Sequence, residues 1–223
     1  MSTKTLGWIF TIFPILGILS WLTAGVPSSP PGEFEGGYAA FAAEIGSVSD
    51  RIHVNLGVAA IVYSVLMGAF LGLRGKIQDN GKSNFAFLAG ILIAIGFAAT
   101  IAENGAFSAA ASLSNEGLVP EAISMLTLAT TAGGYGTAIL ALGIGLLGYS
   151  LYKSKTIHPI SSCAFILVGI YGLIGSILFY DEGLIAAYYF GLTITSVATG
   201  IELIRTAKDL ASNSRAVLFQ PLN

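Results

Sequence analysis

Residues 85–107 read FAFLAGILIAIGFAATIAENGAF, an unbroken apolar run that contains a single charged side chain, Glu103. A bilayer core about 30 Å thick is crossed by roughly 20 such residues in a helix. Lipid offers the backbone no hydrogen bonds, so a spanning segment is either a helix or a strand of a closed barrel. Barrel strands alternate apolar and polar residues, and this run does not. The stretch therefore predicts a transmembrane helix.

Five further runs have the same character, which gives six predicted spans. They cover residues 6–26, 53–73, 85–107, 132–152, 159–180 and 183–204. The composition agrees, because 54% of the 223 residues are hydrophobic and only 10% are charged. A soluble domain carries about 25% charged residues. The predicted fold class is an all-α, polytopic integral membrane bundle of six transmembrane helices.

The basic residues fall on one side of this predicted bundle, with Arg51 as the exception among the 10 Lys and Arg residues. Basic residues flanking membrane spans are retained in the cytoplasm during insertion. We therefore expect a multi-pass protein of the cell membrane with both termini cytoplasmic (N-in/C-in). The basic residues on the predicted cytoplasmic side are Lys4, Arg74, Lys76, Lys82, Lys153, Lys155, Arg205, Lys208 and Arg215.

A single transmembrane domain, residues 1–207, is predicted to carry two external segments. The first is a long loop, residues 27–52. Its residues 38–45, YAAFAAEI, have apolar residues at helical spacing and are expected either to lie along the outer interface or cap the bundle, or to form an ordinary ordered loop. The second is an extension, residues 108–131, in which the third and fourth spans continue as helices and turn at residues 115–117. A cytoplasmic tail, residues 208–223, follows. Its last residues, SNSRAVLFQPLN, resemble the remnant of an engineered protease site, so the tail adds nothing to the functional expectation.

Polar residues near the outer ends of the second and third spans are the candidate ligand contacts. An acid inside an apolar span is costly and marks a functional hypothesis by default, which singles out Glu103 with Asn104 beside it. Arg51, His53 and Asn55 begin the second span on the same side. The alternative is structural: Glu103 as an interfacial acid that pairs with water or Arg51, and Arg51 as a partner for nearby acids.

Small and aromatic residues are open to two interpretations. Gly133, Gly134 and Gly136 cluster near the outer end of the fourth span. They favour either close helix packing or a kink or unwound turn that acts as a hinge. The three tyrosines near the outer ends of the last two spans fit an aromatic belt at the interface. They are Tyr180, Tyr188 and Tyr189.

The sequence lacks the residues that several kinds of site require. His53 and His158 are predicted at opposite membrane faces, and Cys163 is the only cysteine, so no metal, haem or other cofactor is expected. No nucleophile–base motif appears, so no catalytic residue is assigned, and an enzyme is less favoured than a non-enzyme. The small net charge of -2 and the lack of a basic stripe argue against a nucleic-acid partner.

Residues 142–176, LGIGLLGYSLYKSKTIHPISSCAFILVGIYGLIGS, carry a resemblance. They resemble an uncharacterised prokaryotic family of six-helix membrane proteins, classed as a domain of unknown function. The resemblance implies the same six-helix fold and an acid near the position of Glu103. The arginine that this family has in the third span is absent here, where Thr100 stands in that neighbourhood.

Three functions remain open at this point. The leading hypothesis is a protein that binds or transports a small ion or amphiphile through an outward-facing polar cavity. The alternative is a structural or accessory subunit of a larger membrane complex, and a membrane-embedded lipid-modifying enzyme is the weakest. The expected partners are membrane lipids, the small ion or amphiphile, and either a second copy of the chain or a membrane partner subunit.

Overall fold

The computed structural model describes residues 1–27, 29, 31–78, 84–178, 180 and 185–218, and its regular elements are all helices. All of them except α2 are long and apolar enough to cross a membrane, which makes six candidate spans among the described residues. The predicted all-helical bundle with six spans is confirmed to that extent. The helices are α1 (Thr3–Ala24), α2 (Gly37–Ser47), α3 (Ser49–Gln78), α4 (Asn84–Asn115), α5 (Val119–Ser154), α6 (Pro159–Leu178) and α7 (Ile185–Leu218).

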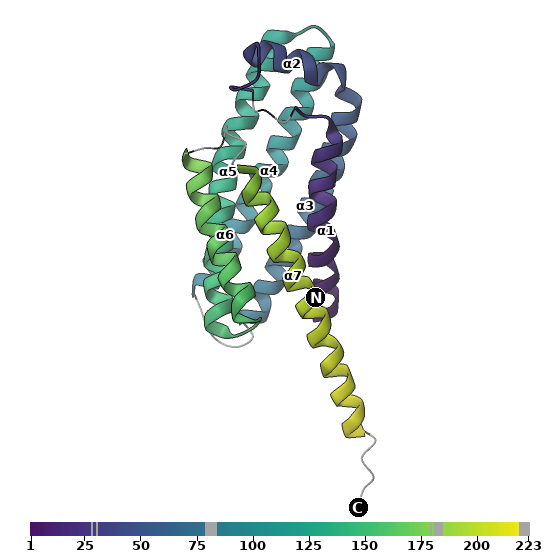
Figure 1. The fold of residues 1–223 in the computed structure, drawn as a ribbon, viewed down its shortest axis with the longest axis vertical. Helices are drawn as coiled ribbons and strands as arrows, with labels where there is room; N and C mark the ends of the chain where they lie inside the picture. Colours follow the sequence, from purple (N-terminus) through teal and green to yellow (C-terminus); the bar gives the residue numbers. More distant parts are fainter. Residues whose placement is uncertain (28, 30, 79–83, 179, 181–184, 219–223) are drawn as a thin grey trace, which may run out of the picture.

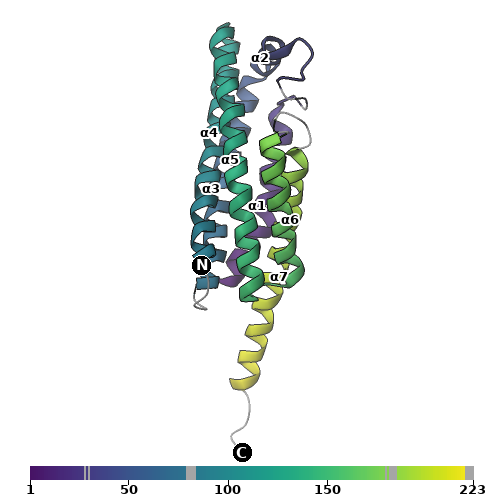
Figure 2. The same ribbon diagram turned by 90° about the vertical axis from the view of Figure 1, so that its left-hand side faces the viewer.

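The helices of the predicted external extension are continuous with the spans below them. α4 runs to Asn115 and α5 starts at Val119, with a tight turn between them. Gly117 in this turn has a φ of 82°, a left-handed conformation that glycine adopts without steric cost. The predicted turn is confirmed. The α4–α5 hairpin rises well past the ends of α6 and α7 (Figures 1 and 2).

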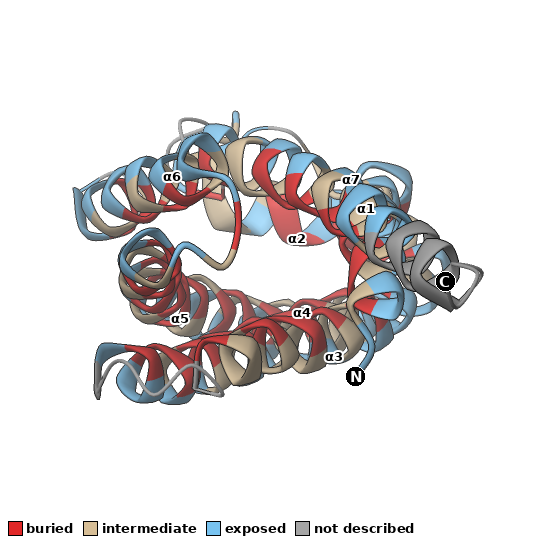
Figure 3. Ribbon diagram, turned by 90° about the horizontal axis from the view of Figure 1, so that it is seen from below, coloured by how far each residue is buried: buried red, intermediate tan, exposed pale blue. Residues whose placement is uncertain are grey.

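The six long helices form a ring. Contacts between neighbours run α1, α3, α4, α5, α6, α7 and back to α1, so each long helix packs against two others. Seen along the ring axis, α3, α4 and α5 form one side, while α6, α7 and α1 form the other (Figure 3). Sequence neighbours therefore account for most of the ring, but its closure joins the first helix to the last.

Glycines make that closure possible, because α1 and α7 cross with their backbones almost in contact. A Cβ added to Gly7 would lie 2.8 Å from the carbonyl oxygen of Gly200. One added to Gly200 would lie 2.6 Å from the carbonyl oxygen of Gly7. Small residues permit such approaches between helices in lipid. Above this crossing the two helices diverge (Figure 1).

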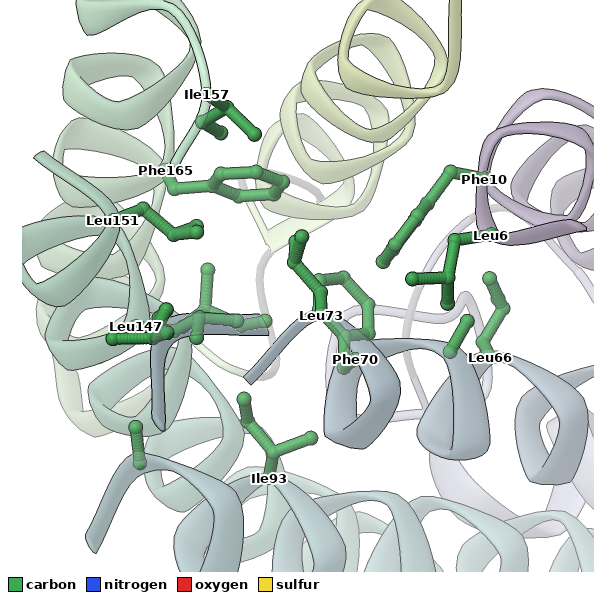
Figure 4. Packing of buried hydrophobic residues seen from close by; sticks show 14 of the residues in the cluster. Leu6, Phe10, Leu66, Phe70, Leu73, Ile93, Leu147, Leu151, Ile157 and Phe165 are labelled. Atoms are coloured by element: carbon green, nitrogen blue, oxygen red, sulfur yellow. The ribbon is translucent and has the colours of Figure 1, made fainter. Parts of the chain in front are cut away.

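Two clusters of buried apolar side chains fill the ring at different heights. The first, near the end that carries the chain termini, includes Leu6, Phe10, Phe70 and Phe165 (Figure 4). The second lies near the opposite end, under α2, and includes Phe41 and other residues of α2, α3, α4 and α5. We call these two ends of the bundle the terminal end and the α2 end. The ring interior between the clusters is where the candidate site lies.

α2 covers the α2 end of the ring. It belongs to the segment predicted as the long loop 27–52, and it packs against α4 and α5. Phe41, Ala42 and Ile45 are buried on its inner face. Gly46 lies so close to α4 that an added Cβ would be 2.8 Å from the hydroxyl of Ser114. Of the two arrangements expected for residues 38–45, the structure shows the helix that caps the bundle.

Candidate functional site

A cavity of about 530 Å³ occupies the ring between the two apolar clusters. Pockets for small organic ligands have volumes of about 300–1,000 Å³, so this one has the size of a ligand site. Its described lining comes from α1, α3, α4, α5 and α7, together with Phe41 of α2 and residues of the connections. Leu66, Phe70 and Leu140 close it toward the terminal end.

Glu103 is the only charged side chain in the described lining of this cavity. It projects from α4 and is only 5% exposed. Tyr180, in the connection between α6 and α7, donates a hydrogen bond of 2.6 Å to its Oε1. Burial, followed by the nearby Tyr189 and Glu103, raises the pKa of Tyr180 well above its ordinary value. Its hydroxyl therefore keeps its proton and acts as the donor.

Two glycines of α5 make room for this pair. A Cβ at Gly133 would overlap both the Tyr180 hydroxyl and the Glu103 carboxylate. One at Gly134 would lie 3.3 Å from the Tyr180 ring. Gly136, in turn, lets α5 approach Ala99 of α4. These glycines pack against the acid and its donor.

α5 is an uninterrupted helix across these glycines. The unwound turn considered at Gly133, Gly134 and Gly136 is therefore absent from the structure. Close packing explains the absence of side chains at these three positions, and a hinge there stays a prediction.

Aromatic side chains surround the acid. Tyr63 of α3 and Tyr189 of α7 line the cavity and lie close enough to interact electrostatically with the Glu103 carboxylate. The Tyr189 hydroxyl is within 2.7 Å of Thr137 Oγ1. Trp21 of α1 also lines the cavity, and its ring meets Phe107 edge-on at a centroid distance of 5.8 Å. The acid thus shares the cavity with several electron-rich rings.

The remaining polar side-chain atoms of the described lining are the indole nitrogen of Trp21 and several hydroxyl groups. Thr100 and Thr130 donate to carbonyl oxygens within their own helices, at Gly96 and Leu126 respectively. Such bonds within a helix are the usual arrangement for Thr in an apolar environment. The hydroxyls of Thr193 and Ser196 add further polar atoms from α7. The cavity is therefore mainly apolar, and its one carboxylate lies among side chains that carry hydroxyl groups.

The wall between α1 and α7 contains exposed residues of the lining. Leu22 of α1 is 67% exposed and Phe190 of α7 is 47% exposed, and both line the cavity. These residues lie above the Gly7–Gly200 crossing, where the two helices diverge (Figure 1). The segment after α1 borders the α2 end of the cavity through Val26, Pro27, Ser29 and Pro31.

The sequence-predicted ligand contacts do not all meet at this cavity. Glu103 lines it. Asn104 is 1% exposed, and neither its amide nitrogen nor its amide oxygen has a hydrogen-bond partner. It is not among the residues that border the cavity.

Arg51, His53 and Asn55 lie at the start of α3, at the α2 end of the bundle, and none of them borders the cavity. His53 Nδ1 is 2.8 Å from the hydroxyl of Ser108 on α4. Asn55 donates to the carbonyl oxygen of Arg51 and accepts from Thr23 of α1. These contacts connect the ends of α1, α3 and α4.

The sequence interpretation missed the tyrosines of the site. Tyr180, Tyr188 and Tyr189 were expected in an interfacial belt, yet Tyr180 and Tyr189 line the cavity beside Glu103. Tyr188 is fully buried, against Gly172 of α6. Tyr63 was not singled out, although a tyrosine in the middle of an apolar span is a usable signal, because its hydroxyl needs a polar environment.

A scan of protein-family models finds none that matches this chain, and no curated protein or solved structure matches it either. The resemblance of residues 142–176 to a six-helix family therefore stays a prediction.

Proposed function

We propose that this chain is a ligand-handling membrane protein that binds an amphiphile in the cavity around Glu103. The observation that supports it is the combination of one buried carboxylate with a mainly apolar wall in a cavity of about 530 Å³. A molecule with a polar head and an apolar body matches both parts. The head would lie at Glu103 and Tyr180, and the body against Leu66, Phe70 and Leu140.

A small inorganic ion fits this cavity less well than an amphiphile. Ca²⁺ takes about six to eight oxygen ligands from carboxylates, carbonyls and water, and Mg²⁺ takes about six and keeps several waters. Glu103 is the only carboxylate in the described lining. The extensive apolar wall would also offer nothing to a hydrated ion. The amphiphile is therefore the preferred member of the two ligand classes.

The proposed orientation places the terminal end in the cytoplasm. The described basic residues of that end, such as Lys4, Arg74, Lys76 and Lys153, lie at the ends of α1, α3 and α5. Basic residues next to membrane spans face the cytoplasm. The cavity, which is bordered by the segment after α1, would then lie toward the outer side of the cell membrane.

Native mass spectrometry of the gently extracted protein tests the proposed function. We expect a small molecule of defined mass to be retained by the unmodified chain and lost from Glu103→Gln, because the polar contact is weakened. Thr193→Phe, which fills the cavity from α7, should lose it as well. The matched control is Glu121→Gln, an exposed acid of α5. Equal retention by all variants would place the molecule elsewhere and contradict the proposal.

A second candidate function, a subunit of a membrane assembly, has one observation in its favour. Gly57, Gly68 and Gly75 of α3 have no atom within 4 Å of an added Cβ. Spacings of 11 and 7 residues keep them on one face of the helix. An open glycine face accommodates a neighbouring helix in lipid. The same feature suits a second copy of this chain or a partner subunit.

A further inference from the structure

We infer, building on the proposed function, that the ligand is an organic monocation: an amphiphile whose head is a protonated amine or a quaternary ammonium group. Three properties of the cavity support this assignment: one acid without a basic partner in the described lining, several aromatic side chains and an apolar end.

A cationic ligand would be the basic partner that the acid of the cavity lacks in the described lining. Glu103 is 5% exposed, and the described lining contains no Lys, Arg or His. A carboxylate in an apolar environment is costly unless a partner compensates it. The Tyr180 hydroxyl supplies one hydrogen bond to Oε1. A carboxylate has about four acceptor positions, so capacity for a cationic donor remains.

The aromatic lining favours the same sign of charge. Tyr63, Tyr180, Tyr189 and Trp21 all border the cavity. The faces of such rings carry partial negative charge and attract ammonium groups, most strongly when the site excludes water. An anionic head would meet both the carboxylate and these rings, and would be repelled by each. The combination of one acid with several tyrosines therefore selects for a cation.

The apolar end of the cavity requires that this cation carries a hydrocarbon body. Phe70, Phe97, Leu66 and Leu140 line the cavity toward the terminal end. Each methylene moved from water to such a surface contributes about 0.8 kcal/mol. A bare ammonium or alkali ion would leave this surface unused. The ligand class that fits all three features is a lipophilic monocation.

Fluorescence titration of Trp21 tests this assignment. The chain has two tryptophans, and Trp8 lies on α1 outside the lining, so Trp8→Phe leaves Trp21 as the only reporter. In nanodiscs of zwitterionic lipid, three probes share one brominated alkyl chain and differ in the head: trimethylammonium, hydroxyl or sulfate. Bromine close to the head quenches Trp21 when the probe occupies the cavity.

The ammonium probe should quench Trp21 saturably, and Glu103→Gln should raise its Kd about tenfold, the equivalent of about 1.4 kcal/mol. The Kd of the hydroxyl probe should change less than about twofold in the same variant, since its head is neutral. Each probe partitions into the lipid to the same extent with every variant, so this contribution cancels when the Kd values of two variants are compared for one probe. Tyr189→Leu should weaken the binding of the ammonium probe only. Tyr189→Phe keeps the ring and should retain most of the affinity for that probe.

The other outcomes separate this inference from the proposed function. If Glu103→Gln weakens the binding of the ammonium and hydroxyl probes equally, the monocation assignment is overturned, while amphiphile binding stands. Tightest binding by the sulfate probe would have the same consequence. If no probe quenches Trp21 saturably, the monocation assignment and the proposed function both fail. Glu121→Gln provides the folded reference in which every affinity should match the unmodified chain.

Discussion

At the scale of single residues, the site depends on a glycine as much as on its acid. Tyr180 reaches Glu103 because Gly133 has no side chain in the space that the two groups occupy. The acid was predicted from the sequence, since a charge inside an apolar run is unusual. The glycine was noticed, but its partner Tyr180 lies 47 positions away in the chain, and no spacing rule relates the two.

Gly133→Ala should displace Tyr180 from Glu103, because the new methyl group would overlap both side chains. Overpacking of this kind costs about 1–3 kcal/mol. We expect a lower thermal unfolding midpoint in detergent. Gly105→Ala is the matched control, since nothing lies within 4 Å of a Cβ at that position in α4. An unchanged midpoint in Gly133→Ala would mean that the pair moves aside at little cost.

The direction of each side chain was the part of the site that the sequence left open. Successive residues of a helix point about 100° apart, so Glu103 and Asn104 face different surroundings. Glu103 reaches the cavity, while Asn104 does not border it. Arg51, His53 and Asn55 lie at the start of α3, at the α2 end of the bundle, and none of them borders the cavity. The sequence shows where a residue lies along its helix, whereas its rotation about the helix axis depends on packing.

At the scale of helices, the ring is closed by one contact between elements from opposite ends of the chain. Consecutive spans with short connections are expected to pack as neighbours, and α3 to α6 do so. The pairing of α1 with α7 could not be read from the sequence. The glycines that permit it, Gly7 and Gly200, are two among 28 in the chain.

Gly200→Ala should weaken this closure. The added methyl group would lie 2.6 Å from a backbone oxygen of α1, which cannot rotate away as a side chain can. We expect a loss of about 1–3 kcal/mol in the free energy of unfolding. Denaturant titration in bicelles measures it, with Gly68→Ala on α3 as the control. Equal stability of the two variants would show that α1 and α7 separate freely at their crossing.

At the scale of the whole molecule, the six spans were readable because each is an apolar run of sufficient length. The start of α1 and the described end of α7 lie at the same end of the bundle (Figure 1). A polar cavity was predicted from the sequence, but its mainly apolar wall was not, because the cavity forms where two apolar clusters fail to meet. Its volume depends on how helices from the whole chain are spaced around the ring.

The proposed orientation predicts which connections are accessible from outside the cell. The only native cysteine is Cys163, so Cys163→Ala provides a cysteine-free background. In this background a cysteine at Glu116, in the α4–α5 turn, should react with a membrane-impermeant maleimide in intact cells. A cysteine at Thr156, between α5 and α6, should react only after the cells are opened. The reverse pattern would contradict cytoplasmic termini.

The long α4–α5 hairpin has a practical consequence for imaging this protein. A helix of 32 residues, the length of α4, spans about 48 Å and exceeds a hydrocarbon core of about 30 Å. A detergent belt around the ring would therefore leave the hairpin tip bare. At 23.0 kDa the chain alone offers little to align in electron micrographs. A rigid helical fusion spliced at Glu116–Gly117 would continue both helices and serve as a fiducial marker.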